Sequence, residues 1–156
     1  MHNQSTTTRI AKSPRRPRAR SGVLTVEMIL VIPILLAVVL ALVQFGITLM
    51  SMQGITAAAR VGTRQATLPS ATQASVEAAV SQVLAGWHFA GKETTEIFVN
   101  GSPVNAGNPL TNAVTGDAVA VRVTVPTTDA VPDLLKFIGG SIVGQDLKTE
   151  FVLRKE

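Results

Sequence analysis

The 156-residue chain contains no cysteine, only two histidines, and charged side chains at just 15% of its positions. Without thiols it has no disulfide framework, no thiolate metal site and no cysteine nucleophile. His2 and His88 lie far apart, and neither stands next to an acidic residue or another histidine, so the pattern offers no metal-ligand pair and no base beside a nucleophile. We therefore expect no cofactor, no metal and no enzymatic activity. Charge this sparse also argues against an entirely soluble chain, because soluble domains average roughly 25% charged residues.

The basic charge is confined to a short head. Six arginines and lysines precede the first acid, Glu27, whereas residues 23–156 carry eight basic and ten acidic side chains. A basic chain often binds nucleic acid, but here the excess lies in a Pro/Arg-rich stretch without interleaved aromatics, so no nucleic-acid partner is expected. A short basic head can instead contact anionic membrane lipid.

A long apolar run follows the head directly. No charged residue occurs between Glu27 and Arg60, and Met28 to Met52 would form a helix of about 37 Å, enough to cross a hydrocarbon core of about 30 Å. The excess of basic residues before the run predicts that the head stays in the cytoplasm and that the rest is exported. The chain thus divides into a basic cytoplasmic leader (1–22), a transmembrane helix (23–52) and an extracytoplasmic domain (53–156).

The junction between head and apolar run carries a glycine, Gly22, followed five residues later by Glu27. This arrangement resembles the class III signal sequence of type IV prepilins. The resemblance implies that a prepilin peptidase cuts after Gly22, that Val23 becomes the new N-terminus, and that Glu27 neutralises the N-terminus of a neighbouring subunit during assembly. Both residue types suit these roles, because glycine lets an extended backbone enter a protease cleft and a carboxylate at a membrane edge needs a cationic partner such as an α-amine.

Further motifs narrow the resemblance to the TadE-like family, the minor pseudopilins of the tight-adherence (Flp) pilus apparatus. They are Val26-Glu27, Pro33, Gln44-Phe45-Gly46 and the run 58–64, and the similarity covers about residues 20 to 68. It implies a structural assembly protein of the bacterial inner membrane, with prepilin peptidase, other pilins or pseudopilins and pilus assembly membrane proteins as partners. Two positions depart from the pattern: Gln44 replaces a frequent acid, which puts a polar role there in doubt, and Val23 replaces the phenylalanine of many major pilins.

Small residues recur every four positions after the predicted span, at Gly54, Ala58 and Gly62. Such spacing lets another backbone approach the helix closely. The pattern alone leaves two partners open: a helix of another subunit, or the sheet of the chain's own domain.

The rest of the chain predicts a small α+β domain of pilin type. The first helix should continue to about Leu68, and a second helix over 71–85 should start at a Ser70/Gln73 capping box. Alternating apolar residues predict three or four antiparallel strands. The strand segments are 96–99, which runs into a tight turn at Asn100-Gly101, then 119–125 and 147–153, with a short helix over 132–137 closed by Gly139-Gly140.

Two other readings compete with this one. The chain could be a pseudopilin of a type II secretion or DNA-uptake system, which neighbouring genes would decide. It could also be an uncleaved signal-anchor protein with an envelope binding domain, in which case Gly22 would be dispensable and the head would persist.

Overall fold

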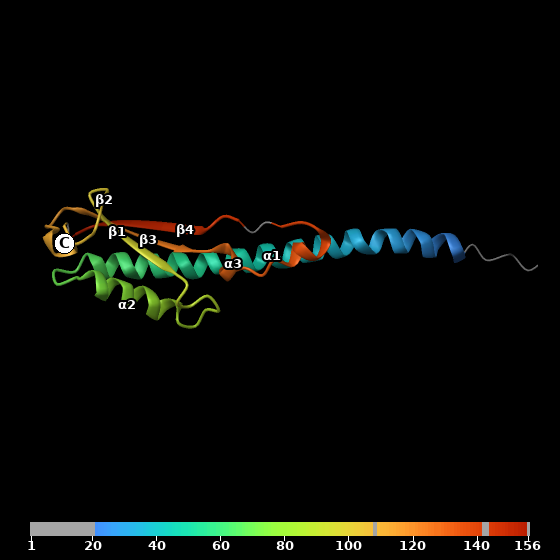
Figure 1. The fold of residues 1–156 in the computed structure, drawn as a ribbon, viewed down its shortest axis with the longest axis horizontal. Coiled ribbons are helices and arrows are strands. Elements are labelled where there is room, and N and C mark those ends of the chain that lie inside the picture. The colour runs from blue at the N-terminus through green and yellow to red at the C-terminus, as the bar shows by residue number, and fades with distance from the viewer. Residues whose placement is uncertain (1–20, 108, 142–143, 156) are drawn as a thin grey trace, which may run out of the picture. The chain divides into compact units, whose positions relative to one another are not determined.

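The computed structural model describes residues 21–107, 109–141 and 144–155 (Figure 1). Most of the predicted leader therefore lies outside the described residues. The chain divides into two compact units, residues 1–35 and 36–156, which are treated separately below.

Helix α1 (Ser21–Ala66) is the longest element of the described chain. Its 46 residues include Pro33, which the helix accommodates, and it ends two residues earlier than the sequence predicted, where Thr67 and Leu68 turn the chain. From Thr25 to Ala66 it is long and apolar enough to cross a membrane, the single such helix among the described residues. The predicted long apolar N-terminal helix is therefore confirmed.

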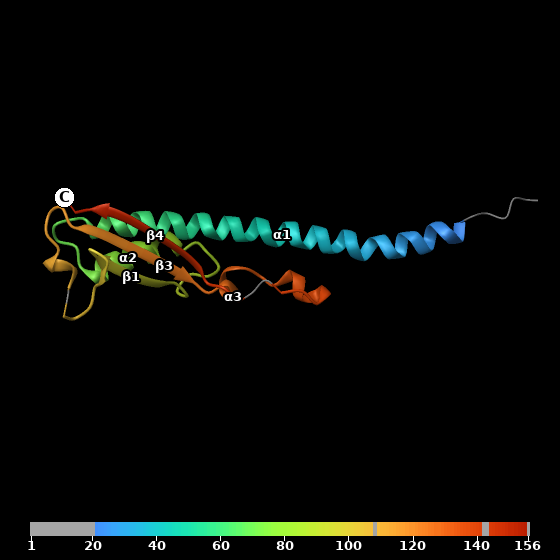
Figure 2. The same cartoon turned by 90° about the horizontal axis from the view of Figure 1, so that it is seen from above.

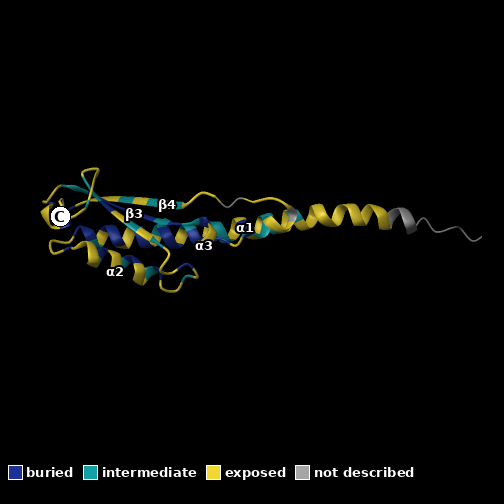
Figure 3. Cartoon of the chain, in the orientation of Figure 1, coloured by how far each residue is buried: buried dark blue, intermediate teal, exposed yellow. Residues whose placement is uncertain are grey.

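The first unit contains the N-terminal part of α1, and its described side chains from 25 to 35 are all exposed (Figure 3). Leu30 is 71% exposed and even the least exposed of its large apolar residues, Val31, reaches 50%. A helix that is apolar on every side belongs in an apolar environment rather than in water.

The second unit holds the second helix that the sequence predicted, α2 (Gln73–Leu84). Its start differs from the expectation: Thr72 is the N-cap and forms a capping box with Ser75, whereas Ser70 and Gln73 do not. Threonine accepts a hydrogen bond from the third helical N–H as serine does, so Ser70 and Thr72 are chemically equivalent N-cap candidates. The path of the chain before α2 decides which of them caps the helix.

The sheet has four antiparallel strands, which confirms the predicted α+β class. They are β1 (Thr94–Val99), β2 (Ser102–Pro103), β3 (Ala118–Val125) and β4 (Leu147–Arg154), in the order β2-β1-β3-β4. Asn100 and Gly101 join β1 to β2 with φ angles of 50° and 81°, the left-handed pair that a tight hairpin requires. Short helical turns η1 (Leu110–Asn112), α3 (Thr127–Ala130) and η2 (Leu134–Ile138) fill the connections, and Gly139 ends η2 with a φ of 80°.

The core lies where one face of the sheet meets the C-terminal part of α1 and helix α2 (Figure 2). The alternating valines of β3 are fully buried there, which is the face that the sequence alternation predicted. They pack with Ile55, Ala58, Ala59 and Ala66 of α1 and with Val76, Val80 and Leu84 of α2.

Candidate assembly site

The predicted processing site lies in the first turn of α1. The backbone of Gly22 and Val23 is helical, and the side chains of residues 21–24 are outside the described set. Glu27 follows in the second turn, exposed between the exposed apolar residues Val26 and Met28. No described residue forms an ion pair with it. The Glu27 carboxylate is thus accessible to a cation from outside the described chain.

The small residues of α1 lie against the chain's own domain. Gly54, Ala58 and Gly62 are all buried. A Cβ on Gly54 would lie 2.5 Å from the indole of Trp87, and one on Gly62 would lie 2.7 Å from Val80 Cγ2. The sequence left open whether this stripe contacts another subunit or the chain's own domain. In the described structure it contacts the chain's own α2, Trp87 and β3.

Gln44 has a role that the sequence did not reveal. Although it belongs to the long uncharged segment of α1, its side chain is fully buried, and its Oε1 accepts a hydrogen bond of 3.1 Å from the backbone N–H of Leu135 in η2. Its Nε2 is buried without a hydrogen-bond partner among the described residues. The sequence did contain one signal for this contact, a single amide side chain within a hydrophobic helix. Such a group needs a hydrogen-bond partner when water is excluded, so a returning segment could have been expected there.

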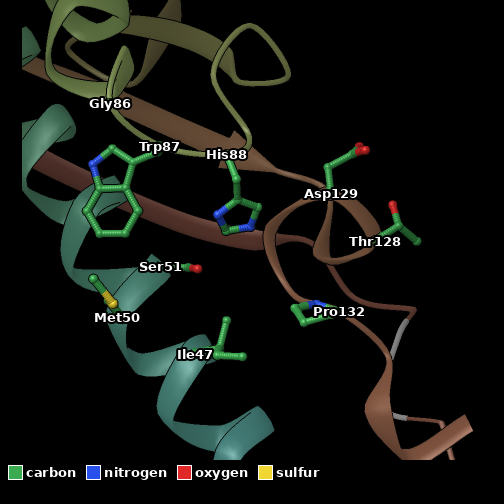
Figure 4. Close-up of a pocket in the computed structure, with 9 residues that line it drawn as sticks. All are labelled: Ile47, Met50, Ser51, Gly86, Trp87, His88, Thr128, Asp129 and Pro132. Atoms are coloured by element: carbon green, nitrogen blue, oxygen red, sulfur yellow. The ribbon is translucent and has the colours of Figure 1, made fainter. Parts of the chain in front are cut away.

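An apolar groove of about 710 Å³ lies beside α1 in the second unit (Figure 4). Figure 4 shows three segments around it: α1 at Ile47, Met50 and Ser51, the loop 86–88, and the chain from Thr128 to Pro132.

Two polar side chains of this groove hold its segments together. Ser51 Oγ donates to the Ala130 carbonyl oxygen at 3.0 Å, and His88 Nε2 lies 2.9 Å from the same oxygen, which can only accept. Ser51 therefore links α1 to α3, and His88 links the loop 86–88 to α3. The two side chains do not form a nucleophile and base pair with each other.

A charge network lies on the face of the sheet that points away from α1. Arg122 pairs with Glu150 at 2.7 Å and with Glu96 at 3.3 Å, and its guanidinium lies 4.6 Å from the ring centre of Phe98. The hydrogen bond with Glu150 is the main cause that raises the pKa of Arg122. Because all three charged side chains are well exposed, the network is expected to contribute little stability.

Asp117 closes the turn between η1 and β3. Its carboxylate accepts hydrogen bonds of 2.8 Å from Asn100 Nδ2 and of 2.8 Å from the Val114 N–H, and the Asn100 side chain in turn accepts from the Ala118 N–H. These bonds, the one from Asn100 first, lower the pKa of Asp117. Within the described ranges, no cluster of three or more His, Cys, Asp or Glu side chains could hold a metal ion.

The comparison with protein families bears on the N-terminal helix. Residues 22–64 match the family model described as TadE-like protein, which confirms the resemblance drawn from the sequence over that segment. The chain has no significant similarity to any curated protein or to any solved structure.

Proposed function

We propose that this chain, TadE-like over residues 22–64, is a minor pseudopilin-like protein that takes part in assembling a tight-adherence (Flp-type) pilus or a related secretion filament. The observation that carries the proposal is the place of the family match. It begins at Gly22, the residue predicted to precede the cut, and runs through the whole apolar helix to Arg64. The support for a structural role is the same match to the TadE-like family.

In this proposal α1 anchors the protein in the bacterial inner membrane by a single pass. The support is the run of exposed apolar side chains at the start of α1, which water would solvate poorly. The basic head favours an N-terminus in the cytoplasm and an exported C-terminal domain.

A prepilin peptidase would then cut between Gly22 and Val23. The new α-amine would lie four residues before Glu27, within about one helical turn, and at the edge of the membrane. A carboxylate in that position is costly unless a cation pairs with it. Because Glu27 is exposed and free of described ion pairs, the N-terminus of a neighbouring helix can serve as that cation.

The processing step is tested by the N-terminal residue and intact mass of the protein from native membranes, with and without the peptidase. We expect a start at Val23 that depends on the peptidase. Gly22→Val should block the cut, because a branched side chain hinders an extended backbone in the cleft, whereas Ser21→Val should not. A retained head would contradict the proposal and favour an uncleaved signal anchor.

The assembly step is tested separately at Glu27. Glu27→Gln should be cut normally but should cross-link poorly to other pilus subunits in membranes, because the amide keeps the shape and loses the charge. Glu27→Asp, which keeps the charge, should retain more of the cross-linked product. Equal assembly of the Gln variant and the parent chain would remove this role.

A further inference from the structure

Turn η2 (Leu134–Ile138) lies against α1 inside the second unit. The contact is specific, since the Leu135 N–H donates to the buried side chain of Gln44 at 3.1 Å. The connection from β3 to β4 thus returns to a stretch of α1 that the sequence assigned to the membrane.

Turn η2 carries one large apolar side chain that no described residue covers. Phe137 is 87% exposed, the highest value for any large apolar side chain in the described chain. With Leu134 it lines a cleft of about 640 Å³ whose other wall is Leu36 and Leu40 of α1. That volume lies within the range of small-molecule sites, roughly 300–1,000 Å³.

Two charged residues also line this cleft. Asp133 Oδ2 accepts a hydrogen bond of 2.8 Å from the Ser141 hydroxyl, whereas Oδ1 is buried without a hydrogen-bond partner among the described residues. Lys136 is exposed and forms no ion pair with a described residue. A long basic side chain beside an apolar surface is the usual arrangement at the head-group level of a membrane.

The position along α1 gives the depth of this cleft. Gln44 lies 17 residues after Glu27, about 26 Å at 1.5 Å per helical residue, against a hydrocarbon thickness of about 30 Å. If Glu27 lies at the cytoplasmic edge, Leu36, about 14 Å further along the helix, falls near the midplane, and Leu40 and Gln44 fall in the outer leaflet. The predicted span 23–52 would be about 45 Å long, more than one bilayer needs.

We propose that residues 133–137 form a phospholipid-binding foot in the outer leaflet, with an acyl chain in the cleft beside Phe137 and the lipid phosphate paired with Lys136. Leu36, which is 44% exposed, and the half-buried Leu40 belong to the long apolar run of α1 and form one wall of the cleft, so the medium that surrounds this run also fills the cleft. The inference rests on the proposed membrane anchorage of α1. The foot would fix the height of the exported domain above the membrane.

The absence of cysteine makes the test direct, because any introduced cysteine is the single labelling site. The full chain carrying Phe137→Cys would be labelled with a polarity-sensitive fluorophore and placed at one copy per nanodisc of phosphatidylethanolamine and phosphatidylglycerol. Val114→Cys, an apolar residue 64% exposed in the loop before β3, is the matched control, and Val31→Cys reports on the helix itself.

We expect nitroxide-bearing lipids to quench the label at 137 several-fold more than the label at 114, and aqueous iodide to do the reverse. Lipid quenching at 31 without quenching at 137 would overturn the foot and leave the anchor intact. Absence of quenching at both 31 and 137 would instead overturn the membrane-spanning helix, and with it the proposed function. A label at 137 shielded from both quenchers would mean that protein covers the cleft, which also overturns the proposal.

The phosphate contact has its own test. Adding Lys136→Glu to the Phe137→Cys chain should reduce lipid quenching and increase quenching by acrylamide, a neutral aqueous quencher, because the acid repels the head group. Lys92→Glu, an exposed lysine in the loop before β1, should change neither. Equal effects of the two charge reversals would overturn the role of Lys136.

Discussion

The N-terminal and C-terminal parts of α1 use apolar residues in opposite ways. Near its start the helix exposes large side chains such as Leu30 and Ile34, which are 71% and 62% exposed. Near its end the buried face consists mainly of small residues, Gly54, Ala58, Ala59 and Gly62, with Ile55 as the one large apolar member, and the residues that cover it come from α2, Trp87 and the sheet. Residue size therefore separates the two parts of the helix better than hydrophobicity does, because only small residues let neighbouring elements approach its backbone.

The largest expected effect on stability comes from deleting a buried aromatic ring, compared with deleting an exposed one on α1. Phe89 is fully buried beside Trp87 and His88, so Phe89→Ala should lower the free energy of unfolding of the domain by about 3–5 kcal/mol. Phe45 is 61% exposed on α1, and Phe45→Ala should leave domain stability nearly unchanged. Unfolding can be followed in detergent by the fluorescence of Trp87, the chain's one tryptophan. Similar losses in both variants would mean that Phe45 on α1 is packed as tightly as Phe89 in the segment after α2.

A smaller effect is expected from one added methyl group. Gly62→Ala places a Cβ 2.7 Å from Val80 Cγ2, and such overpacking costs about 1–3 kcal/mol of unfolding free energy. Gly46, on the same helix, has no atom within 4 Å of the added carbon. Gly46→Ala should therefore cost nothing and can gain up to about 1 kcal/mol from helix propensity. Thermal unfolding of the two variants measures the difference. A larger loss of stability in Gly46→Ala than in Gly62→Ala would contradict the close packing of Gly62 against Val80.

Gln44 is the first buried residue along the described part of α1, and its side chain accepts a hydrogen bond. Gln44→Leu removes the acceptor for the Leu135 N–H, a bond with a net value of about 0.5–1.5 kcal/mol. Hydrogen exchange at the Leu135 amide should accelerate by up to about tenfold. Gln53→Leu, at an exposed position of the same helix, is the control. Unchanged exchange in the Gln44 variant would show that η2 is held by other contacts.

The smallest effect concerns the turn before β3 that Asp117 closes. Because hydrogen bonds lower the pKa of Asp117, its contribution to stability is present above the ordinary aspartate pKa of about 3.9 and is lost as the pH falls through the lower folded-state pKa. The Val114 amide should exchange faster in that acid range. Asn100→Ala removes the main cause, so the pKa of Asp117 should rise toward its ordinary value in an NMR titration. An unaltered titration would assign the shift to another group.

Local patterns predicted most of the elements. The alternation at 119–125, the Asn100-Gly101 turn and the glycine after η2 specify local backbone geometry, and the structure confirms each of them. The capping box was wrong by two residues, since Ser70 and Thr72 are chemically equivalent caps and only packing of the chain after α1 selects between them.

The candidate site was predicted less completely. Gly22, Val23 and Glu27 were identified through the resemblance to prepilin signal sequences, and their roles stay predictions, because they depend on a peptidase and on other subunits. The stripe at 54–62 was visible in the sequence, but its partner was not, since close approach suits an intersubunit helix and an intramolecular sheet equally.

The sequence by itself determined the long apolar helix, the uneven distribution of charge and the α+β class, because these depend on composition and on short-range periodicity. Only the tertiary structure decided that Trp87 and Val80 fill the small-residue stripe and that Gln44 holds η2. These contacts join residues up to 91 positions apart, and no local pattern fixes which distant segment returns to a given helix face.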